Sequence, residues 1–211
     1  MTSISLGWNC SSASEGVACG YRKTKAQGYK TCPFDEMNTN YDGIVRCIQD
    51  NFEGFCDPQY LALRTFPSTC PYYPNETLIV NTKYGFIFNH ESPGHADLYK
   101  TQAWPGGINH FVENNFEHFR ERYTRRIRNF YEYVRSGETI RFLITYPMSD
   151  MVELRRVLNA TCAYTIVRFD IQDMKKFTDH VEIMKSVSSP SQRSTSRESH
   201  QTALGSQTQP L

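Results

Sequence analysis

The first eighteen residues contain the pattern that most restricts the fold of this chain. An apolar run, Ile4-Ser5-Leu6-Gly7, leads through Trp8, Asn9 and Cys10 into a helix-like segment over 11–18. A strand that enters a helix through a tight turn is typical of α/β proteins. The turn places the Cys10 thiol at a helix N-terminus, where the helix dipole and unpaired backbone N–H groups favour the nucleophilic thiolate. Cys10 is therefore the candidate nucleophile.

The rest of the chain continues this alternation. Helical spacing of apolar residues recurs over 40–55, with Asn40 or Asp42 as cap, and over 148–158, with Ser149 as N-cap. Short apolar runs predict strands at 78–80 and 84–88, as a candidate hairpin, and at 139–146 and 164–169. Segment 56–75 holds four prolines and several aromatic residues, which favours a long irregular surface segment.

The clearest helix is predicted over 112–135. Its apolar residues fall three or four apart and form one stripe, which we expect to pack on the sheet. Together the elements predict one α/β domain over 1–185, with a layered sheet of mainly parallel strands flanked by helices. Residues 186–211 are rich in Ser, Gln and Thr and lack aromatic residues, so we expect a disordered tail.

Composition excludes several classes of protein. With 211 residues and a formal net charge of +1, nothing calls for nucleic acid or a membrane surface as partner. No apolar run approaches the length of a membrane span, and the N-terminus lacks the features of a signal peptide. The seven cysteines are an odd number without a C-x-x-C pair, which argues against a disulfide scaffold and a zinc ribbon. We expect a cytoplasmic protein without a cofactor.

Three motifs carry a resemblance to a known family. They are Ser-Leu-Gly-x-Asn-Cys at 5–10, Pro-Phe-Asp at 33–35, and Arg122-Tyr123-x-Arg125-Arg126-Ile127. Over roughly residues 3–170 the chain resembles a little-characterised family of papain-like cysteine peptidases. The resemblance implies a cysteine nucleophile followed in the chain by a histidine. The alternating elements differ from a papain fold, which would place a β-barrel-like half there.

Two histidines are candidates for the base that takes the Cys10 proton. His90 ends a predicted strand, and His95 follows in the same loop after a Ser-Pro-Gly turn. Asp35, held by the rigid pair before it, is the candidate to orient the imidazole, or alternatively a cap. The backbone N–H groups of Cys10 and Ser11, with the Asn9 side chain, form a candidate oxyanion hole.

The loop also permits a metal-binding interpretation, because His90, Glu91, His95 and Asp97 are all ligand types for zinc or iron. No helix fixes their spacing, so we expect no metal. On the helix over 112–135, Arg122 and Arg126 lie four residues apart on one side. They belong to a solvated face or, if they turn toward the sheet, bind an anionic substrate.

Two function classes follow from these patterns. One is a cysteine-dependent hydrolase with a Cys-His centre acting on an acyl or peptide bond. The other is a non-catalytic α/β module that binds a carbohydrate or a nucleotide and in which Cys10 is structural. The reactivity of the Cys10 thiol toward a small alkylating agent separates the two.

Overall fold

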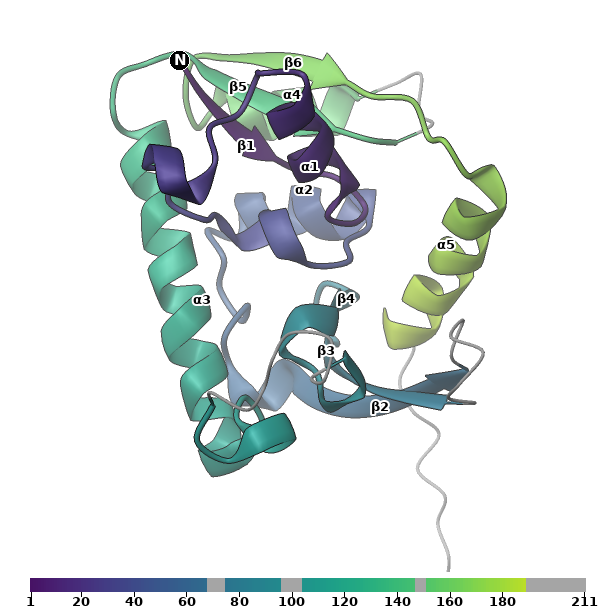
Figure 1. Cartoon of the computed structure of the whole chain (residues 1–211). Helices are drawn as coiled ribbons and strands as arrows, with labels where there is room; N and C mark the ends of the chain where they lie inside the picture. The colour runs from purple at the N-terminus through teal and green to yellow at the C-terminus, as the bar shows by residue number, and fades with distance from the viewer. Residues whose placement is uncertain (68–74, 96–103, 147–150, 189–211) are drawn as a thin grey trace, which may run out of the picture.

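The computed structural model describes residues 1–67, 75–95, 104–146 and 151–188, and its α/β architecture is shown in Figure 1. A parallel sheet has the strand order β1-β5-β6, from β1 (Thr2–Ser5), β5 (Ile140–Ile144) and β6 (Tyr164–Arg168). An antiparallel sheet has the order β2-β3-β4, from β2 (Leu61–Pro67), β3 (Asn75–Asn81) and β4 (Phe86–Phe88). The predicted α/β class is confirmed, and the structure contains an antiparallel sheet in addition to the parallel one.

The helices surround and connect the two sheets. The short α1 (Ser11–Ala18) follows β1, and α4 (Val152–Asn159) connects β5 to β6. The others are α2 (Tyr41–Gln49), α3 (Glu113–Val134) and α5 (Met174–Ser188). In Figure 1, α3 runs along one side of the molecule from the parallel to the antiparallel sheet, and α5 runs along the opposite side. None of the helices in the described ranges is long and apolar enough to cross a membrane.

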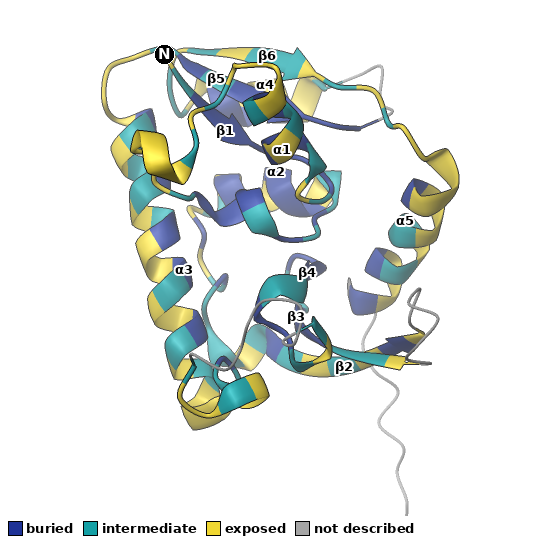
Figure 2. Ribbon diagram, viewed as in Figure 1, coloured by how far each residue is buried: buried dark blue, intermediate teal, exposed yellow. Residues whose placement is uncertain are grey.

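The apolar stripe of α3 faces the interior, as predicted. Phe119, Tyr123 and Phe130 are fully buried, and Figure 2 shows the buried side of this helix turned inward. Phe119 packs edge-to-face on Phe88 of β4, with ring centroids 4.7 Å apart. Phe130 reaches Phe142 of β5. One amphipathic helix therefore joins the cores of both sheets.

Two predicted segments differ from the structure. Segment 56–75 is not wholly irregular, because β2 pairs along its length with β3, from Leu61 opposite Asn81 to Pro67 opposite Asn75. The helix predicted over 40–55 ends at Gln49, since Asn51 and Phe52 have left-handed φ values of 51° and 63°. At its start the prediction holds, because Asn40 caps α2 by accepting a hydrogen bond from the Gly43 N–H at 2.7 Å.

Some of the predicted features lie outside the residues that the structure describes. Helix α5 reaches Ser188, a short way past the expected domain boundary at 185, and the tail predicted beyond it lies outside the described residues. The predicted N-cap Ser149 also lies outside them.

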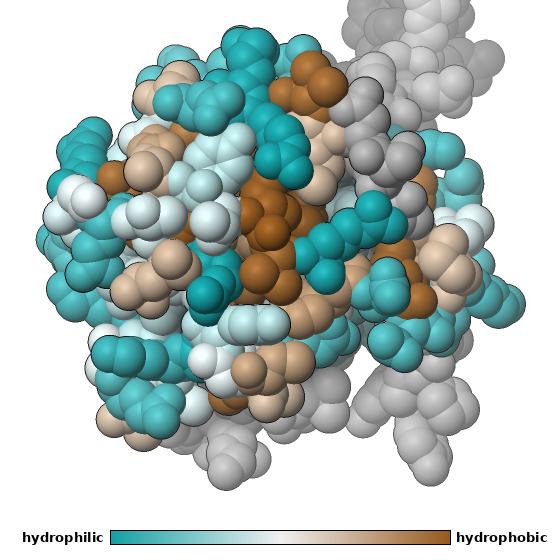
Figure 3. Space-filling model, turned by 90° about the horizontal axis from the view of Figure 1, so that it is seen from above, coloured by the Kyte–Doolittle hydropathy of each residue, from teal (hydrophilic) through white to brown (hydrophobic). Residues whose placement is uncertain are grey.

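The face seen in Figure 3 lies on the side of the parallel sheet and exposes a narrow apolar band between polar side chains. On this side β6 is the sheet edge, and its Ile166 and Val167 are half-buried.

Candidate functional site

The turn that carries Cys10 is held by short-range packing. After β1, the Leu6 N–H donates to the Leu143 carbonyl at 2.7 Å, which extends the parallel ladder toward the turn. The Ser5 and Ser12 hydroxyls hydrogen bond at 2.7 Å. A Cβ at Gly7 would lie 1.8 Å from the Ser12 Oγ, so only glycine fits there. These contacts explain why a serine and a glycine precede the cysteine in the first motif.

Asn9 fixes the start of α1. Its Oδ1 accepts a hydrogen bond from the Ser11 N–H at 2.8 Å, while Cys10 occupies the N-cap position. The Ser11 N–H therefore already has an acceptor, and its role in an oxyanion hole stays a prediction. The Asn9 Nδ2 and the Cys10 N–H are the remaining donors of this predicted set.

The Cys10 thiol lies at the surface end of this turn and is exposed. Partial burial nevertheless raises the pKa of Cys10 above its ordinary value, against a smaller lowering effect of Lys176. The expected low-pKa thiolate is thus not the resting state, and Cys10 rests as a neutral thiol.

Cys10 opens into a cavity of about 510 Å³ between the turn, the antiparallel sheet and α5. Its wall on the sheet is apolar and includes Phe66, Leu78 and Ile87. Its polar lining groups come from all three sides and include Asn9, Asn38, Glu76, Asn89, His95, Lys176 and His180. A concave site that combines an apolar wall with converging polar groups is suited to bind a small molecule or a substrate.

Of the two predicted bases, His95 lines this cavity with Cys10. Its Nδ1 lies 3.3 Å from the Glu76 Oε2, and both side chains are largely buried, with exposures of 20% and 15%. A carboxylate against one ring nitrogen orients an imidazole and selects its tautomer. Glu76 was missed by the sequence interpretation because it lies at the start of β3, next to the segment read as irregular.

His90 lies in a different environment and is not among the lining residues of the cavity. Burial lowers its pKa to about 4, and the nearby Arg126 and Arg122 add to this effect while Glu36 opposes it. His90 is therefore neutral at pH 7, and the charged groups nearest to it include Glu36, Arg122 and Arg126.

The sequence left two roles open for Asp35, orienting the histidine or capping a turn, and the contacts of its carboxylate are structural ones. Its buried carboxylate forms an ion pair with Arg22 at 2.9 Å and accepts hydrogen bonds from the Tyr29 hydroxyl and the Cys32 N–H. A longer contact, 3.4 Å, reaches the Ser5 N–H in β1. None of these partners is an imidazole, so the second motif anchors the segment over 29–36 to the first strand.

Arg122 and Arg126 turn inward, but acidic side chains occupy them. Arg126 is 4% exposed and forms ion pairs with Glu36 and Glu91. Arg122 contacts the same two carboxylates, with its Nε 2.9 Å from the Glu91 Oε1. Both arginines thus have carboxylate partners within the protein, and their use for an anionic substrate stays a prediction. The third motif thus fixes the loop that leads to His95.

Helix α5 forms a wall of the site that no motif indicated. Trp8 packs edge-to-face on Phe177 and on His180, at centroid distances of 5.3 Å and 4.8 Å. The His180 Nε2 lies 3.1 Å from the Thr39 carbonyl oxygen, and burial lowers the pKa of His180 to about 4. His180 is thus a neutral imidazole that ties α5 to the turn before Cys10.

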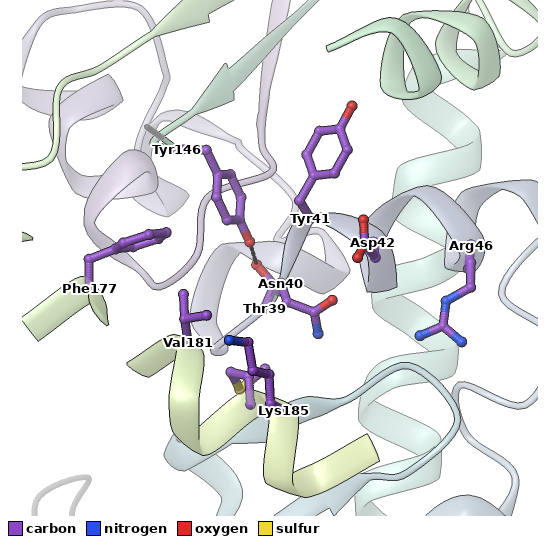
Figure 4. A pocket seen from close by; sticks show the side chains of 10 residues that line it. Thr39, Asn40, Tyr41, Asp42, Arg46, Tyr146, Phe177, Val181 and Lys185 are labelled. Carbon is purple, nitrogen blue, oxygen red and sulfur yellow. Dashed lines mark hydrogen bonds between the residues drawn. The ribbon is translucent and has the colours of Figure 1, made fainter. Parts of the chain in front are cut away.

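A second cavity, of about 580 Å³, lies on another face of α5. Figure 4 shows Phe177 and Val181 on its α5 side, and Tyr146 with Thr39 across from them. The Tyr146 hydroxyl lies 3.2 Å from the Thr39 Oγ1, which in turn donates to the Gly7 carbonyl. This cavity has no cysteine or histidine among its lining residues in the described ranges.

The described residues contain no group of three or more potential metal ligands. His90, Glu91 and His95 therefore do not converge as a metal site, and Asp97 lies outside the described residues.

The fold and the cavity define an α/β protein in which an exposed thiol and a histidine-carboxylate pair line the same cavity. A family model described as "Putative papain-like cysteine peptidase (DUF1796)" matches residues 1–178, so the chain belongs to this family. No curated protein matches the chain significantly. No solved structure does so either.

Proposed function

We propose that this protein is a cysteine-dependent hydrolase of acyl compounds, with Cys10 as nucleophile, His95 as base and Glu76 as the carboxylate that orients His95. The observation that supports the proposal is the shared cavity, which both the Cys10 side chain and the His95–Glu76 pair line. Such a pair is the usual means of activating a thiol that is neutral at rest.

The chemistry proceeds in two steps. His95 takes the Cys10 proton as the sulfur attacks the substrate carbonyl, and the Cys10 N–H and the Asn9 Nδ2 stabilise the oxyanion. The leaving group departs with the proton from His95, which produces a thioester on Cys10. A water molecule, deprotonated by His95, then hydrolyses the thioester and restores the thiol.

The alternative is a binding module in which Cys10 is structural. A structural cysteine is normally buried and unreactive, as Cys32 and Cys47 are here, with pKa values raised well above the ordinary value. The exposure of Cys10 to a cavity that contains a histidine favours the hydrolase.

The test is the rate of alkylation by iodoacetamide from pH 5 to 10, with the modified cysteine identified by peptide mapping. Cys19 is the matched control, because it is exposed and lies at the C-terminal end of the same helix. The raised pKa of Cys10 would by itself slow this reaction, whereas His95 speeds it by taking the thiol proton during the attack. We therefore expect Cys10 to react at least about tenfold faster than Cys19 at pH 7, and His95→Gln to remove this difference. His118→Gln, at a half-exposed position on α3, controls for loss of any histidine. Equal rates for the two cysteines at every pH would contradict the hydrolase proposal and favour the binding module.

A further inference from the structure

The second cavity, which lies beside α5, has no part in the proposed chemistry. It has a volume of about 580 Å³ and shares no lining residue with the Cys10 cavity in the described ranges. Its walls come from the start of α2, from Tyr146 after β5, and from α5. Cavities of this size bind small molecules. The chemistry of the lining side chains therefore indicates which kind of molecule fits.

Three aromatic rings form one wall of this cavity. The ring of Tyr146 lies edge-to-face with that of Tyr41, at a centroid distance of 6.1 Å and an angle of 80°. It has the same relation to Phe177, at 6.0 Å and 85°. Figure 4 shows Tyr146 between the other two rings. Neighbouring rings at right angles form corners, and the faces of aromatic rings attract cations, so this wall is suited to a positively charged group.

The negative charge at this cavity belongs to Asp42. Its side chain lines the cavity and is exposed, and its carboxylate has no hydrogen bond or ion pair with the residues that the structure describes. Burial raises the pKa of the Tyr146 hydroxyl, the Thr39 hydrogen bond opposes this effect, and the charge of Asp42 adds to it, so the carboxylate lies near the ring. An accessible carboxylate beside aromatic rings is thus available to a cationic ligand.

The two positive side chains at this cavity have acceptors within the protein. Arg46 donates to the Lys83 carbonyl at 3.1 Å, and the Lys185 Nζ lies 3.1 Å from the Glu182 carboxylate. In Figure 4 the guanidinium of Arg46 lies beyond Asp42, away from the aromatic rings. Of the three charged side chains in the described lining, Asp42 is therefore the one that remains for a ligand.

Apolar side chains of α5, Val181 and Met184, complete the lining. Alkyl groups fit such a surface, and an ammonium nitrogen that carries alkyl groups also meets the aromatic faces and the carboxylate. A neutral group of the same shape loses the attraction to the rings and to Asp42. An anion of the same shape is repelled by both.

We propose that this cavity binds an organic cation in which alkyl groups surround the ammonium nitrogen, with Asp42 as its counter-charge and the three aromatic rings as its wall. This binding site is separate from the Cys10 cavity and does not depend on the hydrolase proposal.

The test uses three small molecules of similar shape and different charge. Choline is the cation, the alcohol in which a carbon atom replaces the choline nitrogen is the neutral molecule, and tert-butylacetate is the anion. Each is titrated into the isotope-labelled full chain at pH 7, and the affinity is obtained from the shifts of the backbone amide NMR signals.

We expect choline to bind at least about tenfold more tightly than the alcohol, and tert-butylacetate to bind more weakly than either. Asp42→Asn, which keeps the shape of the side chain, should lower the affinity for choline about tenfold and leave that for the alcohol unchanged. Phe177→Leu should lower the affinity for choline at least about threefold. Glu153→Gln is the matched control, because it removes a negative charge from an exposed position on α4 outside the lining, and it should bind choline like the wild type.

Three results would overturn the proposal. Equal affinities for choline and the alcohol would show an apolar cavity without selectivity for charge. Tighter binding of tert-butylacetate would show that Arg46 and Lys185 make this an anion site. Choline binding that is absent, or that survives Asp42→Asn undiminished, would show that Asp42 is not the counter-charge of a cation here. Because Asp42 is exposed, its substitution by Asn should leave the fold intact, and thermal unfolding of the variant checks this.

Discussion

At the scale of single residues, the turn that carries Cys10 depends on side chains that no larger residue could replace. Gly7 and Ser12 are the clearest case, because the Ser12 hydroxyl occupies the space of a Gly7 side chain. The sequence predicted the position of Cys10 well, since a strand, a turn and a helix within eighteen residues are set by local pattern. It did not predict Glu76 as the partner of His95, because their contact depends on how β3 meets the loop after β4.

We expect Gly7→Ala to destabilise the protein by about 1–3 kcal/mol, because the added methyl group meets the Ser12 hydroxyl and displaces the Cys10 turn. Urea unfolding measures the change, and iodoacetamide labelling reports the displaced thiol. Ser12→Ala is the control that loses only the hydrogen bond to Ser5. A Gly7→Ala protein with wild-type stability and wild-type Cys10 reactivity would contradict the tight packing of the turn.

His180 gives the protein a defined sensitivity to acid. Its pKa falls from an ordinary value of 6.5 to about 4 in the folded protein because it is buried. Between these pH values the unfolded chain binds a proton that the folded protein does not, so stability decreases as the pH falls from 6.5 to 4. In His180→Gln, which keeps a donor for the Thr39 carbonyl, this part of the pH dependence disappears.

The measurement is the urea midpoint of each protein at intervals from pH 4 to 8. His118→Gln is the matched variant, since His118 is 39% exposed and should leave the wild-type curve unchanged. Parallel pH curves for wild type and His180→Gln would show that His180 is protonated as easily in the folded protein as in the unfolded chain.

At the scale of elements, ion pairs and packing join segments that are far apart in the sequence. Glu36 of the short helix Pro33–Glu36, Glu91 of the helix Asn89–Glu91, and the two arginines of α3 form one cluster. Periodicity predicted α3 and its inward stripe, but the partners of its arginines depend on tertiary contacts. Strand β2 was missed because only its ends, Leu61 and Phe66, are buried, which weakens the alternation that indicates a strand.

We expect Glu91→Gln to destabilise the protein by about 3 kcal/mol, because it leaves the buried Arg126 and the half-buried Arg122 with less negative charge. It should also slow alkylation of Cys10, since Glu91 anchors the loop to His95. Glu153→Gln breaks an exposed ion pair with Arg156 and should change stability by less than about 0.5 kcal/mol. Equal effects of the two variants would show that the buried cluster contributes no more than a surface pair.

At the scale of the whole molecule, one core extends through both sheets and α5 closes it on the side of the site. Phe177, Met184 and Val187 of this helix are buried, and Phe177 covers Trp8 next to the Cys10 turn. Overall class could be predicted from the alternation of elements. The candidate hairpin over 78–88 is confirmed by the antiparallel pairing of β3 with β4. The pairing of β1 with β5 could not be predicted, because pairing between distant segments leaves no local signal.

The last prediction compares two truncations. Ending the chain at Ser188 removes 189–211, which contains no aromatic residue, so we expect nearly unchanged stability and Cys10 reactivity. Ending it at 172 also removes α5 with its three buried apolar side chains, and each such loss costs about 2–5 kcal/mol. The longer truncation therefore lowers the midpoint of unfolding strongly and uncovers Trp8. In a Trp104→Phe background, Trp8 is the remaining tryptophan, and its fluorescence should shift to the red only when α5 is removed. A red shift on removal of 189–211 alone would show that this segment, rather than α5, protects the turn before Cys10.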